Sequence, residues 1–493
     1  MPSQLIRAKI MLNTRSLSIV ILALTIFSID ATAQTTGKDP VIIIPGVSGT
    51  EIVNSKTGNK VWFSARRDKD DDLRLPINSP NLALNRDGLK AGDIIRKIEL
   101  PVLPDVEVYQ KLIDALVEKG YTEATWNKPK ATDVFYVFAY DWRRDNVESA
   151  RLLMQKMAAV KKTLRKPNLK FDILAHSMGG LIGRYAAMYG TADLGRDGVN
   201  PVPTWAGAVH INKIMMFGTP NEGSARSLDA LLNGYPIIAD RKLPFVDDLR
   251  PEDVMANPTA FQVLPHQASA RFLDENLQPL KLDIYDPKTW EKYGWGAIND
   301  PKFLAKLRGG DKSVLNEKER KELTDPQKQN ADDRLIARTT VAQARSYFAS
   351  ALNRAKRFHQ ALDAPAKTSN VKLFVYGGNC EPTLDAVVLI RDEKKGTWTT
   401  LVDAKDIKTA GGKEYKKAEV KAAMFAMGDG TVTARSLLTA DPSNKSGDEP
   451  AIKPIFAPTS SLFGCISHTK LFLDKPIQDS FLSALVVTEQ KQP

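Results

Sequence analysis

One stretch organises the chain: Phe171-Asp-Ile-Leu-Ala-His-Ser177-Met-Gly-Gly-Leu-Ile-Gly-Arg-Tyr-Ala-Ala-Met-Tyr189. It begins with a short apolar run that is typical of a buried strand. It ends with apolar side chains at the helical spacing i, i+3, i+4 and i+7. Between the two lies the small-x-Ser-x-Gly turn Ala175-His-Ser-Met-Gly179. A serine on a tight turn between a strand and a helix is the arrangement known as a nucleophile elbow.

The elbow turn is strained, so the residues two before and two after the serine must be small. Here they are Ala175 and Gly179. An alternative interpretation is that Ser177 only caps the helix that follows an ordinary strand-to-helix turn. The remainder of the chain has to distinguish the two interpretations.

Composition places the chain among soluble globular proteins with a large core. Of its 493 residues, 43% are hydrophobic and 26% are charged, as in an average globular protein. Since no run of 18 apolar residues occurs, no transmembrane helix is expected in the mature chain. The net charge of +11 can favour an approach to anionic lipid headgroups, but solvated faces explain it more simply. Lysine and arginine are scattered among acidic residues, so no nucleic-acid partner is expected.

The first 33 residues have the pattern of a secretory signal peptide. Three basic residues precede the apolar run 17–29, and the small-x-small sequence Ala31-Thr-Ala33 follows it. This order predicts cleavage before Gln34 and export to the periplasm or the extracellular space. A membrane anchor is the alternative, and the shortness of the apolar run disfavours it.

Strand-like apolar runs alternate with helical patterns along much of the chain. Strands are expected at 41–44, 134–140, 171–175, 211–218 and 371–377, and helices at 109–119, 147–164 and 178–189. This alternation predicts an α/β fold whose mostly parallel sheet carries helices on both faces. Residues 50–100 are mixed and partly very charged, and we interpret them as an insertion loop rather than core.

The regular alternation stops between residues 221 and 368. This region lacks a convincing strand and contains a charged tract at 310–335 and a long helical pattern at 338–362. It predicts a mostly helical cap or lid inserted into the sheet domain, whose core would be 34–220 and 369–493. The apolar runs 387–390 and 398–402 predict an extra hairpin.

A serine nucleophile needs a base, and the base needs a carboxylate that orients it. The chain has five histidines, and four are excluded by their positions: His176 in the elbow, His210 before a core strand, and His266 and His359 in the predicted cap. His468 remains, in a late loop. In α/β-hydrolases the chain order is Ser, acid, His, which His468 satisfies.

The predicted acid is Asp429, which lies between two glycines just after the strand-like segment 424–427. The alternative is a simple Asp-Gly turn, but the position between nucleophile and base favours the acid. Two backbone N–H groups must stabilise the negative charge of the intermediate. Met178, directly after the serine, and Val47, in the turn after the first strand, are the predicted donors.

These motifs together resemble the lecithin–cholesterol acyltransferase family. The matching segments occur in the family's order: Pro45-Gly-Val-Ser-Gly49, Tyr140-Asp-Trp-Arg143, Ala175-His-Ser-Met-Gly-Gly180, Gly218-Thr-Pro220, Gly428-Asp-Gly-Thr-Val432 and His468. The resemblance implies an α/β-hydrolase fold with a cap and a mobile lid, acting on acyl esters of lipids. It also implies Ser177, Asp429 and His468 as the triad, with Val47 and Met178 as oxyanion donors.

Cysteine usage departs from the family pattern. The family's early cysteine pair, which clamps a loop used for lipid docking, has no counterpart here, and Trp62 and Phe63 are only a guess for that role. The two cysteines, Cys380 and Cys465, flank the predicted acid and base, so an exported protein can bridge them. They resemble the family's late pair only in general location. Two cysteines without matching histidines make a poor zinc site, and neither a metal nor a cofactor is expected.

The sequence therefore predicts an exported, serine-dependent lipid acyl hydrolase or O-acyltransferase that works through an acyl-enzyme. Its expected partners are a lipid or acyl-ester substrate and, transiently, a membrane or lipid-particle surface. Apolar cap residues suit a lid over an acyl chain, and suit ordinary core packing equally well: Leu231, Leu232, Ile237 and Ile238. Two alternatives stay open, a non-catalytic relative that binds lipid or protein, and an esterase for non-lipid esters.

Overall fold

A computed structural model describes residues 37–64, 72–98, 106–235, 248–325, 336, 338–365, 370–439 and 458–486. The predicted signal peptide lies outside these residues, as do Ile237 and Ile238 of the cap. Residues from Asp39 onward form one unit by their internal contacts. Within the described part of the chain, no helix combines the length and apolar character needed to cross a membrane.

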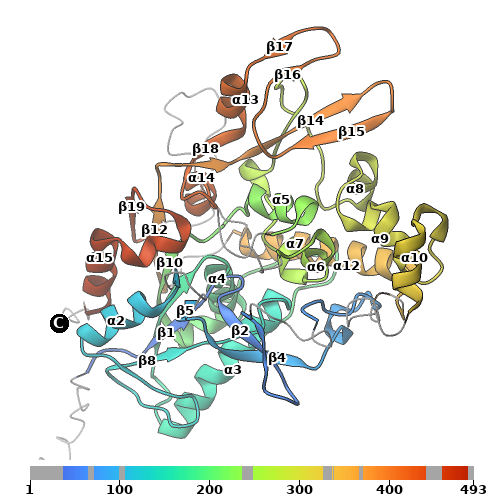
Figure 1. Cartoon of the computed structure of the whole chain (residues 1–493). Helices are drawn as coiled ribbons and strands as arrows, with labels where there is room; N and C mark the ends of the chain where they lie inside the picture. Colours follow the sequence, from blue (N-terminus) through green and yellow to red (C-terminus); the bar gives the residue numbers. More distant parts are fainter. Residues whose placement is uncertain are drawn as a thin grey trace, which may run out of the picture. The chain divides into compact units, whose positions relative to one another are not determined.

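A seven-stranded sheet forms the centre of this unit, in the order β19-β12-β10-β9-β1-β8-β7 (Figure 1). Every neighbouring pair in it is parallel. Its strands are β1 (Val41–Ile44), β7 (Thr122–Glu123), β8 (Val134–Val137), β9 (Phe171–His176), β10 (Ile211–Phe217), β12 (Lys372–Gly378) and β19 (Ser460–Gly464). The inner strands are rich in β-branched and other apolar residues because both of their faces are buried. The prediction of a mostly parallel α/β-hydrolase sheet is confirmed.

Helices cover both faces of the sheet, as predicted. Alternate residues of each strand point to opposite faces, so Ile42 and Ile44 of β1 join one core cluster and Val41 and Ile43 join the other. The first cluster includes residues of α3 (Asn146–Leu164) and α4 (Met178–Tyr189). The second includes residues of α2 (Gln110–Glu118), the 3-10 helix η6 (His468–Leu473) and α15 (Lys475–Val486).

Part of the segment interpreted as an insertion loop is a small sheet. Strands β2 (Thr50–Asn54), β3 (Lys60–Trp62) and β4 (Leu89–Ile94) pair antiparallel. Ile52 and Trp62 are buried in the main core, so the interpretation as a loop outside the core is wrong for these strands. These strands are short, and only some of their residues are buried. Their sequences therefore contain no continuous apolar run from which a strand could be predicted.

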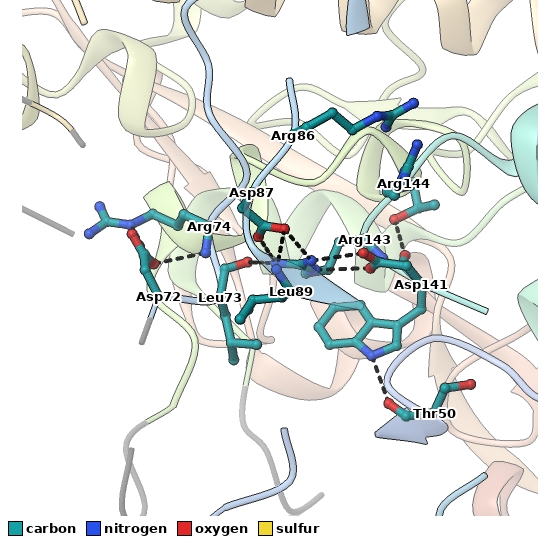
Figure 2. A network of polar contacts seen from close by, with 12 residues as sticks. Thr50, Asp72, Leu73, Arg74, Arg86, Asp87, Leu89, Asp141, Arg143 and Arg144 are labelled. Atoms are coloured by element: carbon teal, nitrogen blue, oxygen red, sulfur yellow. Dashed lines mark hydrogen bonds and ion pairs between the residues drawn. The ribbon is translucent and has the colours of Figure 1, made fainter. Parts of the chain in front are cut away.

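Next to this small sheet, a buried arginine connects two segments of the chain (Figure 2). Arg143 follows β8 and is fully buried. Its guanidinium pairs with Asp141 at 2.7 Å and with Asp87 at 2.5 Å, and it also donates to the Leu73 carbonyl at 3.2 Å. Burial alone would lower the pKa of Arg143, but the two carboxylates outweigh it and raise that pKa. A cation paired in this way ties residues 73–87 to the end of β8.

The region between β10 and β12 is mostly helical. It contains α5 (Ala225–Asn233), α6 (Pro251–Met255), α7 (Pro258–Phe261), α8 (Pro287–Tyr293), α9 (Pro301–Lys306), α10 (Glu317–Thr324) and α12 (Val341–Leu362). The long helix starts at Val341 and not at residue 338, because Thr340 and Gln343 form a capping box. Helix α12 packs against α7, α8 and the elbow helix α4.

One strand occurs in this region where none was expected. β11 (Arg271–Leu273) pairs in parallel with β14 (Ala386–Asp392), which forms the predicted hairpin with β15 (Thr397–Leu401). The extra hairpin therefore pairs with the cap region and not with the main sheet. A strand of three residues gives no detectable period in the sequence.

Hydrogen bonds join the helical region between β10 and β12, which the sequence predicts as a cap, to the loop after β8. The Thr259 hydroxyl donates to the Trp142 carbonyl at 2.7 Å, and the Gln262 side chain bridges the Asn146 N–H and the Asp145 carboxylate, both at 2.8 Å. Arg354 of α12 pairs with Asp145 at 2.6 Å. The loop after β8 thus contains Arg143 and also forms the hydrogen bonds to the helical region between β10 and β12.

Candidate active site

Ser177 lies between β9 and α4 with φ 52° and ψ −127°. A positive φ is costly for a residue with a side chain and persists only where the surroundings impose it. Its N–H donates to the Phe217 carbonyl of β10 at 2.7 Å. The Ser177 side chain makes no capping hydrogen bond to α4, so the alternative interpretation as a helix cap is wrong.

Gly179 explains why the elbow requires a small residue after the serine. A Cβ at this position would lie 2.6 Å from the Ile44 carbonyl oxygen and 2.7 Å from that of Pro45. Both contacts are with backbone, which cannot easily move away. The absence of a side chain therefore lets α4 start directly against the end of β1.

Asp429 follows β18 (Phe425–Gly428), which pairs with β13 (Glu381–Leu384). The side chain is buried, and its Oδ1 accepts hydrogen bonds from the Thr431 N–H at 3.0 Å and the Val432 N–H at 2.7 Å. Thr383 of β13 accepts from the Gly430 N–H at 2.8 Å. These bonds fix the carboxylate and leave Oδ2 available to another partner.

That partner is His468, the first residue of η6. Its Nδ1 lies 2.7 Å from Asp429 Oδ2, and its backbone N–H donates to the Asp429 carbonyl at 2.8 Å. A Cβ at Gly218, whose φ is +58°, would lie 2.8 Å from His468 Nδ1 and 2.9 Å from Asp429 Oδ2. Glycine is therefore needed at position 218 both for its backbone conformation and for the close approach of the acid–base pair.

The end of β10 contacts all three residues of the predicted triad. The Phe217 carbonyl accepts from Ser177, and the next residue, Gly218, lies against His468 and Asp429. Ser177 and the acid–base pair thus both lie against the carboxyl end of β10, and the carboxyl ends of parallel strands are where catalytic groups of open α/β sheets gather.

One predicted oxyanion donor directly follows the serine in the chain, and the other directly follows a glycine that packs against it. Met178 is the first residue of α4, and the N–H of a first helical residue has no partner inside its helix. Val47 follows Gly46, where a Cβ would lie 2.8 Å from Ser177 Cβ. The partial positive charge of the α4 N-terminus also favours a negative charge at this position.

The other histidines have different surroundings. His176 turns its Nδ1 towards the Tyr109 hydroxyl at 2.8 Å, and burial, with a smaller effect of His468, lowers its pKa to about 3. His266 and His359 stack on each other with ring centroids 3.9 Å apart, and His266 pairs with Asp363 at 3.2 Å. His210 ends a 3-10 helix before β10. None of these four rings is hydrogen-bonded to Asp429 within the described residues.

A disulfide links the two loops around the acid–base pair. Cys380, just after β12, is bonded to Cys465, just after β19, with a Cα–Cα distance of 5.3 Å. Cys465 lies three residues before His468, so the bridge restrains the loop that carries the base. Among the residues that the structure describes, no group of three or more His, Cys, Asp or Glu residues is arranged to hold a metal ion.

The structure contradicts one apolar guess from the sequence, and for two further residues it decides between alternatives that the sequence left open. Trp62 is buried against Trp142, and its indole N–H donates to the Ser48 carbonyl at 2.8 Å, so it does not offer a lipid-docking surface. Leu231 is buried and Leu232 packs against the core, as expected for ordinary packing. Both predictions were made from apolar character alone, which does not distinguish a lid from a core.

Two residues near the site were not found from the sequence. Thr383 holds the acid loop, and Tyr109 contacts both the turn after β1 and His176. Tyr109 is 67 residues from His176 in the chain, and only the tertiary fold joins them. No local pattern in the sequence could have given this contact.

A comparison with protein-family models agrees with the family resemblance predicted from the sequence motifs. Residues 54–247 match the family model of lecithin:cholesterol acyltransferase. The resemblance to this family is confirmed over that range. The match contains Ser177 and Met178, but it starts after Val47 and ends before Asp429 and His468. It supports acyl hydrolysis or acyl transfer as the general class of chemistry. A comparison with curated proteins gave no match.

Three solved structures show a likeness over most of the chain. A chain of the Tle4–Tli4 complex is 15% identical, with a TM-score of 0.47, over 90% of this chain and 97% of that one. The Bacillus licheniformis lipase BlEst2 in its propeptide form is 12% identical, with a TM-score of 0.31, over 92% and 52%. EstA from Clostridium botulinum is 11% identical, with a TM-score of 0.29, over 92% and 88%.

Proposed function

We propose that the chain is an exported, serine-dependent lipid acyl hydrolase or O-acyltransferase that works through an acyl-enzyme. The observation that carries this proposal is the 2.7 Å contact between His468 Nδ1 and Asp429 Oδ2, at the same end of β10 that binds the N–H of Ser177 in its positive-φ turn. A serine, a histidine and a buried carboxylate in this relation form the unit that activates a hydroxyl group for attack on an ester.

In the proposed reaction, His468 Nε2 takes the Ser177 hydroxyl proton while the serine oxygen bonds to the ester carbonyl carbon. The carbonyl π electrons move to oxygen, and the Val47 and Met178 N–H groups stabilise the resulting negative charge. When the intermediate collapses, the bond to the leaving alkoxide breaks and His468 returns the proton to it. Asp429 holds the imidazole orientation and stabilises its charged form in both steps.

The acyl group on Ser177 then passes to an acceptor by the reverse sequence. His468 deprotonates either water, which gives hydrolysis, or an alcohol, which gives a new ester. Exclusion of water by the cap decides between the two outcomes. The family match over residues 54–247 supports a lipid ester as the acyl donor.

Export to the periplasm or the extracellular space is proposed from residues 1–33 of the sequence. Expression of the full chain in a Gram-negative host tests it. The proposal expects a secreted or periplasmic product whose N-terminal residue is Gln34. A cytoplasmic product that retains residues 1–33 would contradict export and leave the proposed chemistry unaffected.

Turnover by the mature chain tests the chemistry. Release of fatty acid from phosphatidylcholine vesicles and cleavage of a soluble short-chain ester would be measured, with and without a long-chain alcohol acceptor. Ser177→Ala should lower kcat by on the order of 10⁴-fold or more with unchanged thermal unfolding. Ser149→Ala in α3 is the control and should retain turnover.

The outcomes separate the alternatives. Turnover that survives Ser177→Ala would overturn the proposed mechanism. Cleavage of the short-chain ester without any release from vesicles would instead identify an esterase for non-lipid esters. Binding of vesicles without turnover of either substrate would identify a non-catalytic lipid-binding protein.

A further inference from the structure

A second buried polar unit lies directly behind the proposed triad. It consists of Tyr109, the residue before α2, and His176, the last residue of β9. Tyr109 is 2% exposed and His176 is 9% exposed. Neither residue has a part in the proton transfers described above, so their burial and hydrogen bonds require a separate explanation.

Tyr109 holds the turn that carries the predicted oxyanion donor. Its hydroxyl oxygen accepts a hydrogen bond from the Gly46 N–H at 2.9 Å. A Cβ at Gly49 would lie 2.9 Å from the same hydroxyl and from the ring edge, so the ring also supports the other end of the turn. The turn itself is closed by the Gly49 N–H, which donates to the Gly46 carbonyl at 3.2 Å. Val47 lies between these two anchored glycines.

His176 connects Tyr109 with the backbone of the base. Its Nε2 lies 3.2 Å from the His468 carbonyl oxygen, and its Nδ1 lies 2.8 Å from the Tyr109 hydroxyl. A carbonyl can only accept, so the proton of the neutral ring must be on Nε2. Nδ1 is then a bare acceptor, and Tyr109 donates its hydroxyl proton to it. Burial keeps the ring neutral by lowering the His176 pKa to about 3.

The backbone of His468 is consequently fixed at both of its polar groups. Its N–H donates to the Asp429 carbonyl at 2.8 Å, and its carbonyl accepts from His176. Phe472 packs against the rings of both Tyr109 and His176, with centroid distances of 5.8 Å and 5.3 Å. A continuous chain of hydrogen bonds therefore runs from Gly46 through Tyr109 and His176 to His468.

We propose that Tyr109 and His176 are a positioning pair that sets the oxyanion turn, residues 46–49, in register with the imidazole of His468. This inference rests on the proposed function. The pair takes no proton from the reacting groups, and it acts through Gly46 on one side and on His468 on the other. The contact with His468 involves both its backbone carbonyl and its imidazole, whose ring centroid lies 4.8 Å from that of His176. Both the donor of the oxyanion hole and the base are then held to one rigid unit.

Tyr109→Phe is the most selective variant, because it removes one oxygen and keeps the ring. The Gly46 N–H and the His176 Nδ1 lose their partner, so the turn and the imidazole can shift relative to each other. Displacements of this kind reduce transition-state stabilisation more than substrate binding. We expect kcat to fall by about 10- to 100-fold, with KM changed by less than about two-fold.

Tyr136→Phe is the matched control. Tyr136 of β8 is another buried tyrosine whose hydroxyl accepts from a backbone N–H. It donates to a carbonyl, and both of its partners are in Lys130, at 2.8 Å and 2.6 Å. Its loss likewise removes one hydroxyl with two hydrogen bonds, away from the proposed triad. It should lower the thermal unfolding temperature about as much as Tyr109→Phe while leaving kcat within about two-fold of wild type.

His176 variants test the other half of the pair. His176→Leu removes both hydrogen bonds, whereas His176→Gln can return an N–H donor near the position of Nε2. We expect a loss of kcat in His176→Leu similar to that in Tyr109→Phe, and partial recovery in His176→Gln. Because the pair acts as a unit, the double variant Tyr109→Phe with His176→Leu should cost little more than the larger single change.

The measurements are kcat and KM on the soluble ester, with active protein counted by fluorophosphonate titration so that unfolded protein does not enter kcat. Wild-type kcat in Tyr109→Phe, or equal losses in Tyr109→Phe and Tyr136→Phe, would overturn the positioning role while leaving the proposed function intact. Strict additivity of the double variant would overturn the coupling between turn and base. Turnover that persists in Ser177→Ala would instead overturn the proposed function itself.

Discussion

Two buried polar networks surround the turn after β1, and they differ in charge. On one side, Tyr109 and His176 connect Gly46 with His468 through neutral groups. On the other, Arg143 is held by two carboxylates and by a backbone carbonyl (Figure 2). Both networks reach the same short stretch of chain, because Tyr140 and Trp142 beside Arg143 donate to the Pro45 and Thr50 carbonyls, at 2.8 Å and 3.1 Å.

The difference reflects what each network has to do. A fully charged cluster binds distant segments firmly, but a cation next to His468 would disfavour the imidazolium that must form during the reaction. Neutral groups can fix the backbone of the base without adding charge to the site. We therefore expect changes in the first network to act on turnover and changes in the second to act on stability.

Asp429→Asn should show the largest difference between its effect on turnover and its effect on stability. The asparagine keeps the shape of the side chain but removes the negative charge opposite His468 Nδ1 and no longer fixes its tautomer. By analogy with other Ser-His-Asp units, kcat should fall on the order of 10⁴-fold with little change in thermal unfolding. Turnover close to that of wild type would contradict the assignment of Asp429 as the acid.

Arg143→Met should give the opposite result. It leaves Asp87 and Asp141 without their buried counter-charge, which typically costs about 3–5 kcal/mol of unfolding free energy. Denaturant unfolding measures this loss, and kcat per folded molecule should remain within a few-fold of wild type.

The neighbouring Arg144→Met is the control for that loss. Arg144 pairs with Glu148 at a partly exposed position on the surface of α3, and such pairs contribute at most about 1 kcal/mol. An equal effect of the two substitutions would mean that the buried cluster is not what stabilises this part of the chain.

A further buried carboxyl group lies at the opposite end of β9 and extends the comparison to pH dependence. Asp172 lies 3.3 Å from Lys213, and its Oδ1 accepts from Asn212 at 3.0 Å. Burial raises the Asp172 pKa from 3.8 to about 6, although Lys213 opposes the shift. The folded state then holds this proton at pH values where the unfolded state has lost it. Stability from this group is therefore complete below about pH 4 and lost as the pH rises through 6.

Asp172→Asn should remove that pH dependence. Wild type should lose unfolding free energy between pH 4 and 6.5, and in Asp172→Asn this loss should be smaller by about 2 kcal/mol. Asp193→Asn is the control for the direction of the pKa shift. Burial would raise the Asp193 pKa, but Arg354 outweighs it and lowers that pKa, so Asp193 titrates below this range. An unchanged slope in Asp172→Asn would contradict the assignment of a raised pKa to Asp172.

The sequence was sufficient where structure is local. β9, the elbow and α4 could be predicted because one long apolar run, one strained turn and one helical period follow each other within 19 residues. β1 and β10 could be predicted for the same reason, as their strands are buried on both faces. Asp429 and His468 were predicted from chain order. Asp429 was chosen for its position between two glycines, and His468 by elimination among only five histidines.

The sequence was insufficient where tertiary contacts decide. Ile52 and Trp62 belong to short strands that form only because they pair with neighbouring strands. In the same way, β11 is a strand because it pairs with β14. Tyr109 has no local pattern, because its partners Gly46 and His176 are 63 and 67 residues away. Propensity and periodicity describe neighbours in the chain, whereas these residues depend on neighbours in space.

The central claim is that Ser177 is an activated nucleophile, and covalent labelling tests it most directly. The purified mature chain would be treated with a fluorophosphonate, with and without detergent to open a lid, and the modified peptide would be identified by mass spectrometry. The account predicts one label per molecule on Ser177, none in Ser177→Ala and a strongly reduced rate in Asp429→Asn. No label on wild type under either condition, or a label that persists in Ser177→Ala, would contradict it.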